Sequence, residues 1–535
     1  MAMDIHMPKS RAPNQENRTI AIIGAGVSGL LACKYALQKG FSPTVFEARS
    51  SIGGVWSRTC DSTKLQTPKN HYRFSDFAWS DSVKEAFPDH NQVREYIYSY
   101  ALHFNILPHI KFNCKVVSVD YLCTSSEEDM SSWELWAGTG EAFSPKGKWH
   151  VSVQDLQTSA DTTQVYQFDF VILCLGKFSG LANIPPFAMN KGPEVFDGEV
   201  MHSMDYAAMD NAAEFIKNKR VTIVGFQKSA IDIGAEIAKV NGAKHPCTLL
   251  FRTAHWSVPE NLVEFIFRNL NRVSELTVHK PDEAFFLWLL AALLSPLLWI
   301  YSKVIENYLK WLYPLAKYDI IPEHGFLGQI RSCMLTVLPA DFYEIVREGC
   351  LILKKAQTFS FCQTGVVVDD EDVPLETDIV IFATGYKSDQ KFASVFKSID
   401  FQKYLLGSSA PFYRECIHPK IPQLAIVGYS ESHATIYTTE IRAKWLAHFL
   451  EGNFRLPTIR EMEHNVMRWE KCMRRYTDPN FKRGCVSVML QIYCNDEICR
   501  DMNCNPRRKK SILSELFAPY GPSDYADLSS LGREE

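Results

Sequence analysis

The sequence carries no marked excess of charge of either sign. Its 57 Lys and Arg residues nearly balance 61 Asp and Glu residues, and the formal net charge is -4. No nucleic-acid partner is therefore expected, because proteins that bind a phosphate backbone present a strongly basic surface. Hydrophobic residues make up 46% of the chain and charged residues 22%, so a globular protein with a large core is indicated rather than a disordered one.

The cysteines lack the spacing of a metal site. Cys485, Cys494, Cys499 and Cys504 crowd the C-terminal region, but their gaps contain no CxxC knuckle of the kind that binds structural zinc. No metal is expected. The 15 cysteines also show no regular pairing, and residues 1–17 lack the apolar core of a signal peptide. We therefore expect free thiols and a cytoplasmic protein.

The chain contains two copies of one folding pattern. Its 535 residues suffice for roughly three to four domains of about 150 residues each. After a loose tail, residues 1–17, a buried strand, a helix ending near Gly40 and the strand PTVFEA form a βαβ unit. A second strand, turn and helix occupy residues 220–240, and a strand follows at 248–251. The predicted fold is α/β, with two Rossmann-like dinucleotide-binding domains and a C-terminal helical extension.

The first copy carries a complete phosphate-binding turn. Its sequence GAGVSG fits GxGxxG, in which the glycines allow a tight turn, close approach of a pyrophosphate and close packing of helix on strand. The helix N-terminus supplies amide donors and a partial positive charge. Glu47 ends the next strand, where its carboxylate can accept both ribose hydroxyls. The predicted dinucleotide-binding residues of this turn are Gly24, Ala25, Gly26, Val27, Ser28 and Gly29.

A second glycine pair follows Glu47 and indicates which dinucleotide binds. In EARSSIGGVW, Gly53 and Gly54 precede Val55 and Trp56. This arrangement of acid, spacer and GG resembles that of flavoproteins with two dinucleotide-binding domains, in which the extra turn lies along FAD. The resemblance implies FAD as the first ligand, bound also by Gly54, Val55 and Trp56.

The second copy of the turn lacks its middle glycine. In TIVGFQKSAI, Gln227 stands at the second glycine position and Ala230 at the third. The loss would crowd a pyrophosphate, and Lys228 could compensate as a point charge on phosphate. Arg252 ends the next strand, where an arginine accommodates a 2′-phosphate, so NADPH is favoured over NADH. The predicted NADPH-binding residues of the turn itself are Gly225, Phe226, Gln227, Lys228, Ser229 and Ala230.

Further motifs resemble those of one enzyme family. FDGEVMHSMDY, residues 196–206, fits F-x-G-x-x-x-H-x-x-x-Y and is similar to the identifying sequence of the flavin-containing monooxygenases. IFATGY, residues 381–386, resembles the family's ATG-type strand, and HPKIPQLAIVGY, residues 418–429, its late flavin-side strand. The resemblance covers about residues 19–450. The chain is thus identified as a member of this family, of plant type.

The resemblance implies a division into domains. FAD would be bound by residues 18–190 and 376–456, with an NADPH domain inserted at 191–375 and a C-terminal extension at 457–535. The strand at IFATGY is expected to return to the first sheet, and Thr384 and Gly385 are implied to bind cofactor.

The resemblance also implies the chemistry. NADPH would reduce FAD, and the C4a-hydroperoxyflavin formed with O₂ would oxygenate a soft nucleophile, with little side-chain acid–base catalysis. The family usually places an asparagine near C4a. Gln66 in LQTPKN stands at that position and is implied as the catalytic residue, with Thr67 as a cofactor neighbour. A loop glutamine that faces solvent is the alternative.

The implied substrate is a small amine. TKLQTPKNHYRFSDF, MHSMDY, GFQKSAID and FAPYGPSDY are most similar to the pathogen-induced plant members that N-hydroxylate pipecolic acid in systemic immunity. Two alternatives remain open. One is S-oxygenation of a small thioether, as in other plant branches, and the other is a flavin-binding sensor whose altered second turn no longer supports turnover.

One long apolar run bears on localisation. Residues 284–301, AFFLWLLAALLSPLLWIY, carry no charge over 18 residues, close to the roughly 20 that cross a bilayer. A complete crossing is not expected, because segments on both sides of the run would hold one FAD. The alternatives are a buried helix pair broken at Pro296, or peripheral contact with a membrane such as the cytosolic face of the endoplasmic reticulum.

Overall fold

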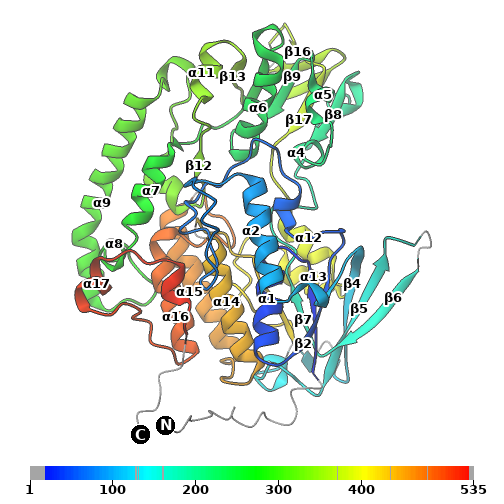
Figure 1. The fold of residues 1–535 in the computed structure, drawn as a ribbon, viewed down its shortest axis with the longest axis vertical. Coiled ribbons are helices and arrows are strands. Elements are labelled where there is room, and N and C mark those ends of the chain that lie inside the picture. The colour runs from blue at the N-terminus through cyan, green and yellow to red at the C-terminus, as the bar shows by residue number, and fades with distance from the viewer. Residues whose placement is uncertain are drawn as a thin grey trace.

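The computed structural model describes residues 18–528, apart from 127, 128, 131, 159–161, 370, 434 and 479. The tail predicted at residues 1–17 lies outside the described residues. Figure 1 shows two α/β units, the second above the first, with the C-terminal helices beside the lower unit and one long helix along the left edge. The predicted fold class is confirmed.

The first unit is built on a sheet of five parallel strands in the order β18-β7-β1-β2-β3. Its central strands are short apolar runs buried on both faces, as a parallel sheet covered by helices requires. Helix α1 (Val27–Gln38) connects β1 to β2 and packs against α14 (Thr435–Leu450). The strands are β1 (Thr19–Ile23), β2 (Ser42–Phe46), β3 (Ile110–Lys111), β7 (Phe170–Leu173) and β18 (Leu424–Ile426).

The second unit repeats this arrangement. Its five parallel strands have the order β13-β10-β9-β17-β8, and α6 (Lys228–Asn241) connects β9 to β10 as α1 connects β1 to β2. Each unit also inserts a three-stranded antiparallel meander, before β7 in the first unit and before β17 in the second. The parallel strands are β8 (Glu199–His202), β9 (Val221–Val224), β10 (Cys247–Phe251), β13 (Leu351–Lys355) and β17 (Ile379–Phe382).

The strand of IFATGY belongs to the second sheet, so the expectation that it returns to the first sheet is wrong. β17 pairs with β9 and β8, and the chain re-enters the first sheet only at β18. The boundary expected at residue 376, between the NADPH domain and the second FAD segment, therefore falls after β17. The similarity of this strand to β7 has a structural reason, because each lies beside the first strand of its own unit.

The remaining strands and helices surround the two sheets. The first meander comprises β4 (Cys114–Cys123), β5 (Gly147–Asp155) and β6 (Thr163–Phe168), and the second comprises β14 (Phe359–Cys362), β15 (Gly365–Val368) and β16 (Leu375–Glu376). The helices outside the later insertion are α2 (His90–His103), α4 (Ser203–Tyr206), α5 (Ala212–Ile216), α11 (Phe342–Arg347), α12 (Ser388–Ser394) and α13 (Ile399–Leu405).

A helical insertion leaves the second unit between β10 and β13 and packs on the C-terminal helices. It starts and ends at a short parallel pair, β11 (Ser257–Val258) and β12 (Thr336–Val337). Helix α10 of the insertion contacts α15, and α8 contacts α16 and α17. The helices of the insertion are α7 (Glu260–Arg268), α8 (Arg272–Glu275), α9 (Phe285–Leu312) and α10 (Phe326–Arg331). The C-terminal helices are α15 (Ile459–Thr477), α16 (Gln491–Asp501) and α17 (Ile512–Phe517).

The apolar run forms part of one continuous helix, so the expected helix pair broken at Pro296 is wrong. Helix α9 extends over 28 residues with Pro296 inside it. A proline cannot donate a backbone hydrogen bond to the carbonyl four residues earlier. The Ser295 hydroxyl donates to the Ala292 carbonyl at 3.1 Å and so satisfies the group that the proline leaves free. Only 11% of its most apolar 18-residue window is buried, which also excludes the buried alternative.

Candidate cofactor and substrate cavity

The first glycine turn has the geometry of a phosphate-binding turn. Gly24 has φ +103°, and a Cβ there would lie 2.6 Å from the Cys174 carbonyl oxygen at the end of β7. Gly26 is the N-cap of α1, no side chain caps this helix, and its first turn contains no acidic residue. The free amide groups and positive end of α1 therefore remain available to an anion.

The second glycine pair packs directly on this turn. The Gly53 amide donates to the Ala25 carbonyl at 3.1 Å, and a Cβ on Gly26 would lie 3.5 Å from the Gly54 Cα. Glu47 follows β2, and its carboxylate accepts the Ala25 amide at 2.7 Å. The backbones of the two turns thus form a cradle without side chains, bordered by a carboxylate, as a dinucleotide requires.

The second turn repeats the first despite its missing glycine. Gly225 has φ +141°, and a Cβ there would lie 2.6 Å from the carbonyl oxygen of Ala383, the residue after β17. Gly24 has the same relation to Cys174, the residue after β7. Gln227 is the N-cap of α6, with an extended backbone (φ -115°, ψ -175°) that any residue adopts. The middle position therefore does not need glycine for its backbone conformation.

Three predicted residues of the second turn have different surroundings. Ser229 faces the cavity described below, whereas Ala230 is fully buried inside α6. The Lys228 ammonium donates to the buried Asp232 carboxylate at 2.7 Å. The ammonium of Lys228 is therefore already paired with a carboxylate. Its contact with a phosphate of NADPH stays a prediction.

A cavity of about 1670 Å³ lies between the two units. It extends from the second glycine turn to Val55 and Trp56, which follow the second glycine pair, whereas the first glycine turn itself lies outside its lining. Predicted site residues that line it are Val55, Trp56, Gln66, Gly225, Phe226, Gln227, Lys228, Ser229, Arg252, Thr384 and Gly385. Those that lie outside its lining are Gly24, Ala25, Gly26, Val27, Ser28, Gly29, Glu47, Gly54, Thr67 and Ala230.

Gln66 faces the cavity and contacts the second unit. Its Oε1 accepts the Val337 amide of β12 at 3.1 Å, which leaves its amide donors free to face the cavity. Thr67 is buried, and its hydroxyl donates to the His433 carbonyl at 2.6 Å. The catalytic role of Gln66 stays a prediction, but the solvent-facing alternative does not fit this hydrogen bond.

The loop after β17 borders the same cavity. Gly385 has φ +82° and its carbonyl lies 3.0 Å from His202 Nε2, so the imidazole donates to this carbonyl. Nδ1 of His202 accepts the Met204 amide at 3.2 Å, which leaves the proton on Nε2. His202 therefore fixes the loop that carries Thr384 and Gly385.

His433 was missed in the sequence and carries two buried ring nitrogens without a partner in the described chain. It follows β18 on a loop that also approaches Ser28 of the first turn, since a Cβ on Gly428 would lie 2.0 Å from the Ser28 hydroxyl oxygen. Burial lowers the pKa of His433 to about 4, so the imidazole is neutral at pH 7. Among the residues that the structure describes, none hydrogen-bonds either buried ring nitrogen. His433 lies outside the cavity lining, and we expect a bound dinucleotide to supply the partner that these buried atoms lack within the described residues.

A charged group was also missed, because three distant segments form it. Glu431 follows β18, and its carboxylate oxygens lie 3.7 Å from the ammonium groups of Lys177 and Lys482. All three residues line the cavity. Burial lowers the pKa of Lys177, against the opposing effect of Glu431 and Asp389. No short motif in the sequence marks this group.

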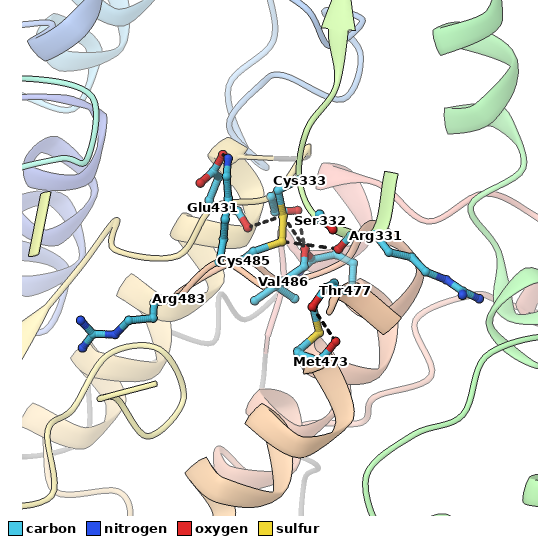
Figure 2. The surroundings of a disulfide bond; sticks show 12 residues. Arg331, Ser332, Cys333, Glu431, Met473, Thr477, Arg483, Cys485 and Val486 are labelled. Carbon is cyan, nitrogen blue, oxygen red and sulfur yellow. Dashed lines mark hydrogen bonds and ion pairs between the residues drawn. A yellow bond between two sulfur atoms is a disulfide. The ribbon is translucent and has the colours of Figure 1, made fainter. Parts of the chain in front are cut away.

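A disulfide joins two segments of the cavity wall, so the expectation that all thiols are free is wrong. Cys333 lines the cavity after α10 and is bonded to Cys485 of the C-terminal extension. Figure 2 shows Glu431 beside this bond, with Arg331 and Arg483 pointing to opposite sides. The Glu431 backbone pairs with this extension, because its amide donates to the Gly484 carbonyl at 2.7 Å. The bond connects the insertion to the extension next to the charged group.

Two dinucleotide-binding units across one cavity define a flavoprotein with two dinucleotide-binding domains. The family model described as "Flavin-binding monooxygenase-like" matches residues 17–515, and the chain belongs to this family. It is 38% identical over 529 residues to "Probable flavin-containing monooxygenase 1" of Arabidopsis thaliana, covering 96% of this chain and 97% of the relative.

Solved structures share the fold at low sequence identity. An OTEMO complex with FAD and NADP covers 91% of this chain and 99% of its own, with TM-score 0.62 and 16% identity. An S-allyl-L-cysteine S-oxygenase from Allium sativum covers 91% and 88%, with TM-score 0.55 and 18% identity. By its family, the chain is an FAD- and NADPH-dependent monooxygenase, and the cradle at Gly26 fits the flavin dinucleotide. Among the described residues, no group of three or more His, Cys, Asp or Glu could hold a metal ion.

Replacing His433 by leucine is expected to lower FAD retention about tenfold. The substitution removes both ring nitrogens, and a hydrogen bond to a buried group contributes about 1 kcal/mol or more. Titration of the deflavinated protein with FAD, followed by quenching of flavin fluorescence and by the absorption spectrum, measures the change. The exposed His464 on α15 provides the control variant His464→Leu, which should bind FAD as the wild type does. Equal affinity and an unchanged spectrum in both variants would remove His433 from the site.

Proposed function

We propose that this monooxygenase oxygenates the nitrogen of a small amine that also carries a carboxylate, with pipecolic acid as the candidate substrate. The proposal follows the resemblance of its motifs to the pathogen-induced plant members of the family, which implies a role in plant systemic immunity. The overall reaction consumes one secondary amine, O₂, NADPH and a proton, and yields the hydroxylamine, water and NADP⁺. FAD and NADPH supply the redox chemistry and activate O₂.

The charged group in the cavity wall is the observation that supports this substrate class. Lys177, Lys482 and Glu431 together carry a net charge of +1 when ionised, so this part of the wall attracts an anionic group. Glu431 can accept a hydrogen bond and the proton from the nitrogen, which reacts as the neutral amine, while Lys482 can donate to a carboxylate. An amino acid presents both groups at a short distance, which an amine without a carboxylate does not.

The cavity wall also limits the access of water. Cys333, Met334 and Leu335 line the same cavity as Gln66, whose side chain accepts the amide of the nearby Val337. A substrate bound between these residues and the charged group would displace water from both. Exclusion of water protects an oxygenating enzyme against unproductive loss of its activated oxygen.

A second candidate is S-oxygenation of a thioether amino acid. The Allium sativum protein of similar fold is an S-oxygenase of S-allyl-L-cysteine, which carries an amino group and a carboxylate as pipecolic acid does. The charged wall would hold either substrate by these groups. Sulfur and nitrogen oxygenation therefore differ in which atom the chain places at the oxygenating centre.

Product analysis separates the two candidates. The purified holoenzyme is incubated with NADPH and either pipecolic acid or S-allyl-L-cysteine, and mass spectrometry locates the added oxygen. We expect an N-hydroxylated product and substrate-dependent NADPH consumption with pipecolic acid. Oxygen added only to sulfur would support the second candidate. NADPH consumption with neither product would contradict the proposed substrate class.

Replacing Lys482 by glutamine is expected to raise KM for the amino acid substrate about tenfold or more. A charged hydrogen bond to a carboxylate is worth about 1.5–3 kcal/mol. KM for piperidine, which lacks the carboxylate, should not change, and neither should KM for NADPH. The exposed Lys403 on α13 gives the control variant Lys403→Gln. If Lys482→Gln leaves the preference for pipecolic acid over piperidine intact, the wall does not recognise the carboxylate.

A further inference from the structure

Helix α9 presents a long apolar surface that nothing in the described chain covers. Its side chains along one face are more than half exposed, although most belong to residue types that are normally buried. Figure 1 shows α9 along the outer edge of the molecule, away from both sheets. Exposed members of this surface include Phe285, Phe286, Leu293, Leu297, Trp299 and Trp311.

The opposite face of α9 explains how the helix is attached. Its second half buries Ser302, Ile305, Glu306 and Leu309 against the insertion. The Glu306 carboxylate accepts the Phe326 amide at the start of α10 at 3.0 Å. The first half has only Ala291 buried, so it projects its apolar side chains away from the protein.

The one carboxylate of α9 is buried and neutralised. Its only acidic residue, Glu306, is 5% exposed and pairs with Lys303 at 2.7 Å, whereas Lys310 is exposed. The exposed surface is therefore apolar with a basic residue at Lys310 and no carboxylate of its own. This combination complements an anionic lipid surface.

A second exposed apolar helix lies near the start of α9. Helix α17 presents Ile512 and Leu513, which are 81% and 72% exposed, and the exposed Lys510 precedes it. Its carbonyl at Phe517 accepts the Asn271 side-chain amide at 3.2 Å, which ties α17 to the insertion beside α8. Figure 1 shows α8 and α17 at the lower end of α9.

We propose that the exposed faces of α9 and α17 form one surface that rests in the interfacial region of a lipid bilayer. The helix lies along the protein and both its ends return to the same folded body, so it does not cross the membrane. A protein partner fits less well, because about one hydrogen bond forms per 100–200 Å² of a protein interface and residues 285–300 offer almost no polar side chains. Tryptophans on the exposed face suit the bilayer interface.

Vesicle flotation tests the surface with the full-length holoenzyme. The probes are vesicles of phosphatidylcholine alone and of phosphatidylcholine with phosphatidylserine. The triple variant Leu293→Gln, Leu297→Gln, Trp299→Gln changes exposed side chains only, so its flavin content and circular dichroism should match the wild type. We expect the wild type to float, more so with phosphatidylserine, and the triple variant to float at least about tenfold less, because each buried apolar side chain adds substantially to membrane affinity.

A control variant and a measurement of oligomeric state distinguish membrane binding from nonspecific loss of binding and from dimer formation. Ile399→Gln with Leu406→Gln changes exposed apolar residues on and beside α13 of the first unit and should float as the wild type does. Light scattering without lipid measures oligomeric state. A wild-type dimer that the triple variant converts to a monomer would show that a second copy covers this face and would overturn the proposal. Wild-type protein that does not float, or a triple variant that floats equally, would overturn it as well.

Discussion

Replacing Gly29 by alanine is expected to destabilise the first α/β unit by about 3 kcal/mol, the upper part of the range for an overpacked position. A Cβ at Gly29 would lie 1.9 Å from the Gly24 carbonyl oxygen. Gly24 cannot move away, because it already holds a left-handed φ of +103° next to the backbone of Cys174. The loss is a large part of the 5–15 kcal/mol by which domains are stable, so thermal unfolding should begin at clearly lower temperature.

Replacing Gly26 by alanine is expected to leave the fold intact and to remove the flavin. Gly26 has φ -75°, which alanine adopts freely, and its Cβ would make an ordinary 3.5 Å contact with Gly54. The added methyl group would occupy the cradle where the pyrophosphate approaches the backbone. We expect the FAD content per polypeptide to fall more than about tenfold, since a methyl group in contact with the pyrophosphate prevents close binding.

The comparison of the two variants separates folding from binding. Gly328 on α10 has open space around its Cβ position and no positive φ, so Gly328→Ala serves as the control and should be neutral in both assays. Absorbance at the flavin band measures retention, and circular dichroism during heating measures stability. A yellow, fully loaded Gly26→Ala protein would refute the assignment of FAD to the first turn. A Gly29→Ala protein of wild-type stability would refute the packing argument.

Local patterns predicted the parts of the fold that depend on neighbours in the chain. The strand, turn and helix around Gly24 and around Gly225 follow from short apolar runs and glycines, and both occur as expected. The sheet to which β17 belongs could not be predicted in this way. Two equivalent strands of a repeated unit have the same pattern, and only pairing across distant segments assigns each to its sheet.

The site shows the same limit. Residues on the glycine turns, together with Gln66 and Arg252, were found because a motif or a strand end marks them, and Gln66 and Arg252 line the cavity. Lys177, Glu431 and Lys482 carry no such mark. They come from the end of β7, the end of β18 and the C-terminal extension, and only the tertiary fold brings them together. The disulfide of Cys333 likewise joins residues 152 positions apart.

Replacing Arg252 by alanine is expected to raise KM for NADPH about 10–100-fold and to leave KM for NADH nearly unchanged. The reason lies in the equivalence of the two units. The Gly24 amide donates to the Phe46 carbonyl, and the Gly225 amide donates to the Leu250 carbonyl. The residue after Phe46 is the ribose-side Glu47, and the residue after Leu250 is Phe251.

The second unit therefore has an apolar ring where the first has a carboxylate. Phe251 stacks on Phe226 with ring centroids 4.2 Å apart, and the next residue is the exposed Arg252. A 2′-phosphate would meet no repelling carboxylate there, and the guanidinium lines the cavity. Within the described part of the chain, no carboxylate forms an ion pair with Arg252, so its charge remains available to the ligand.

Steady-state kinetics with both nucleotides provide the test. A charged hydrogen bond to phosphate is worth about 1.5–3 kcal/mol, which corresponds to the expected 10–100-fold change. Arg347→Ala on α11 removes an exposed arginine outside the cavity lining and is the matched control. Arg252→Glu should invert the preference, because it restores a carboxylate beside the ribose and repels the 2′-phosphate. An Arg252→Glu enzyme that still prefers NADPH would show that another group recognises this phosphate.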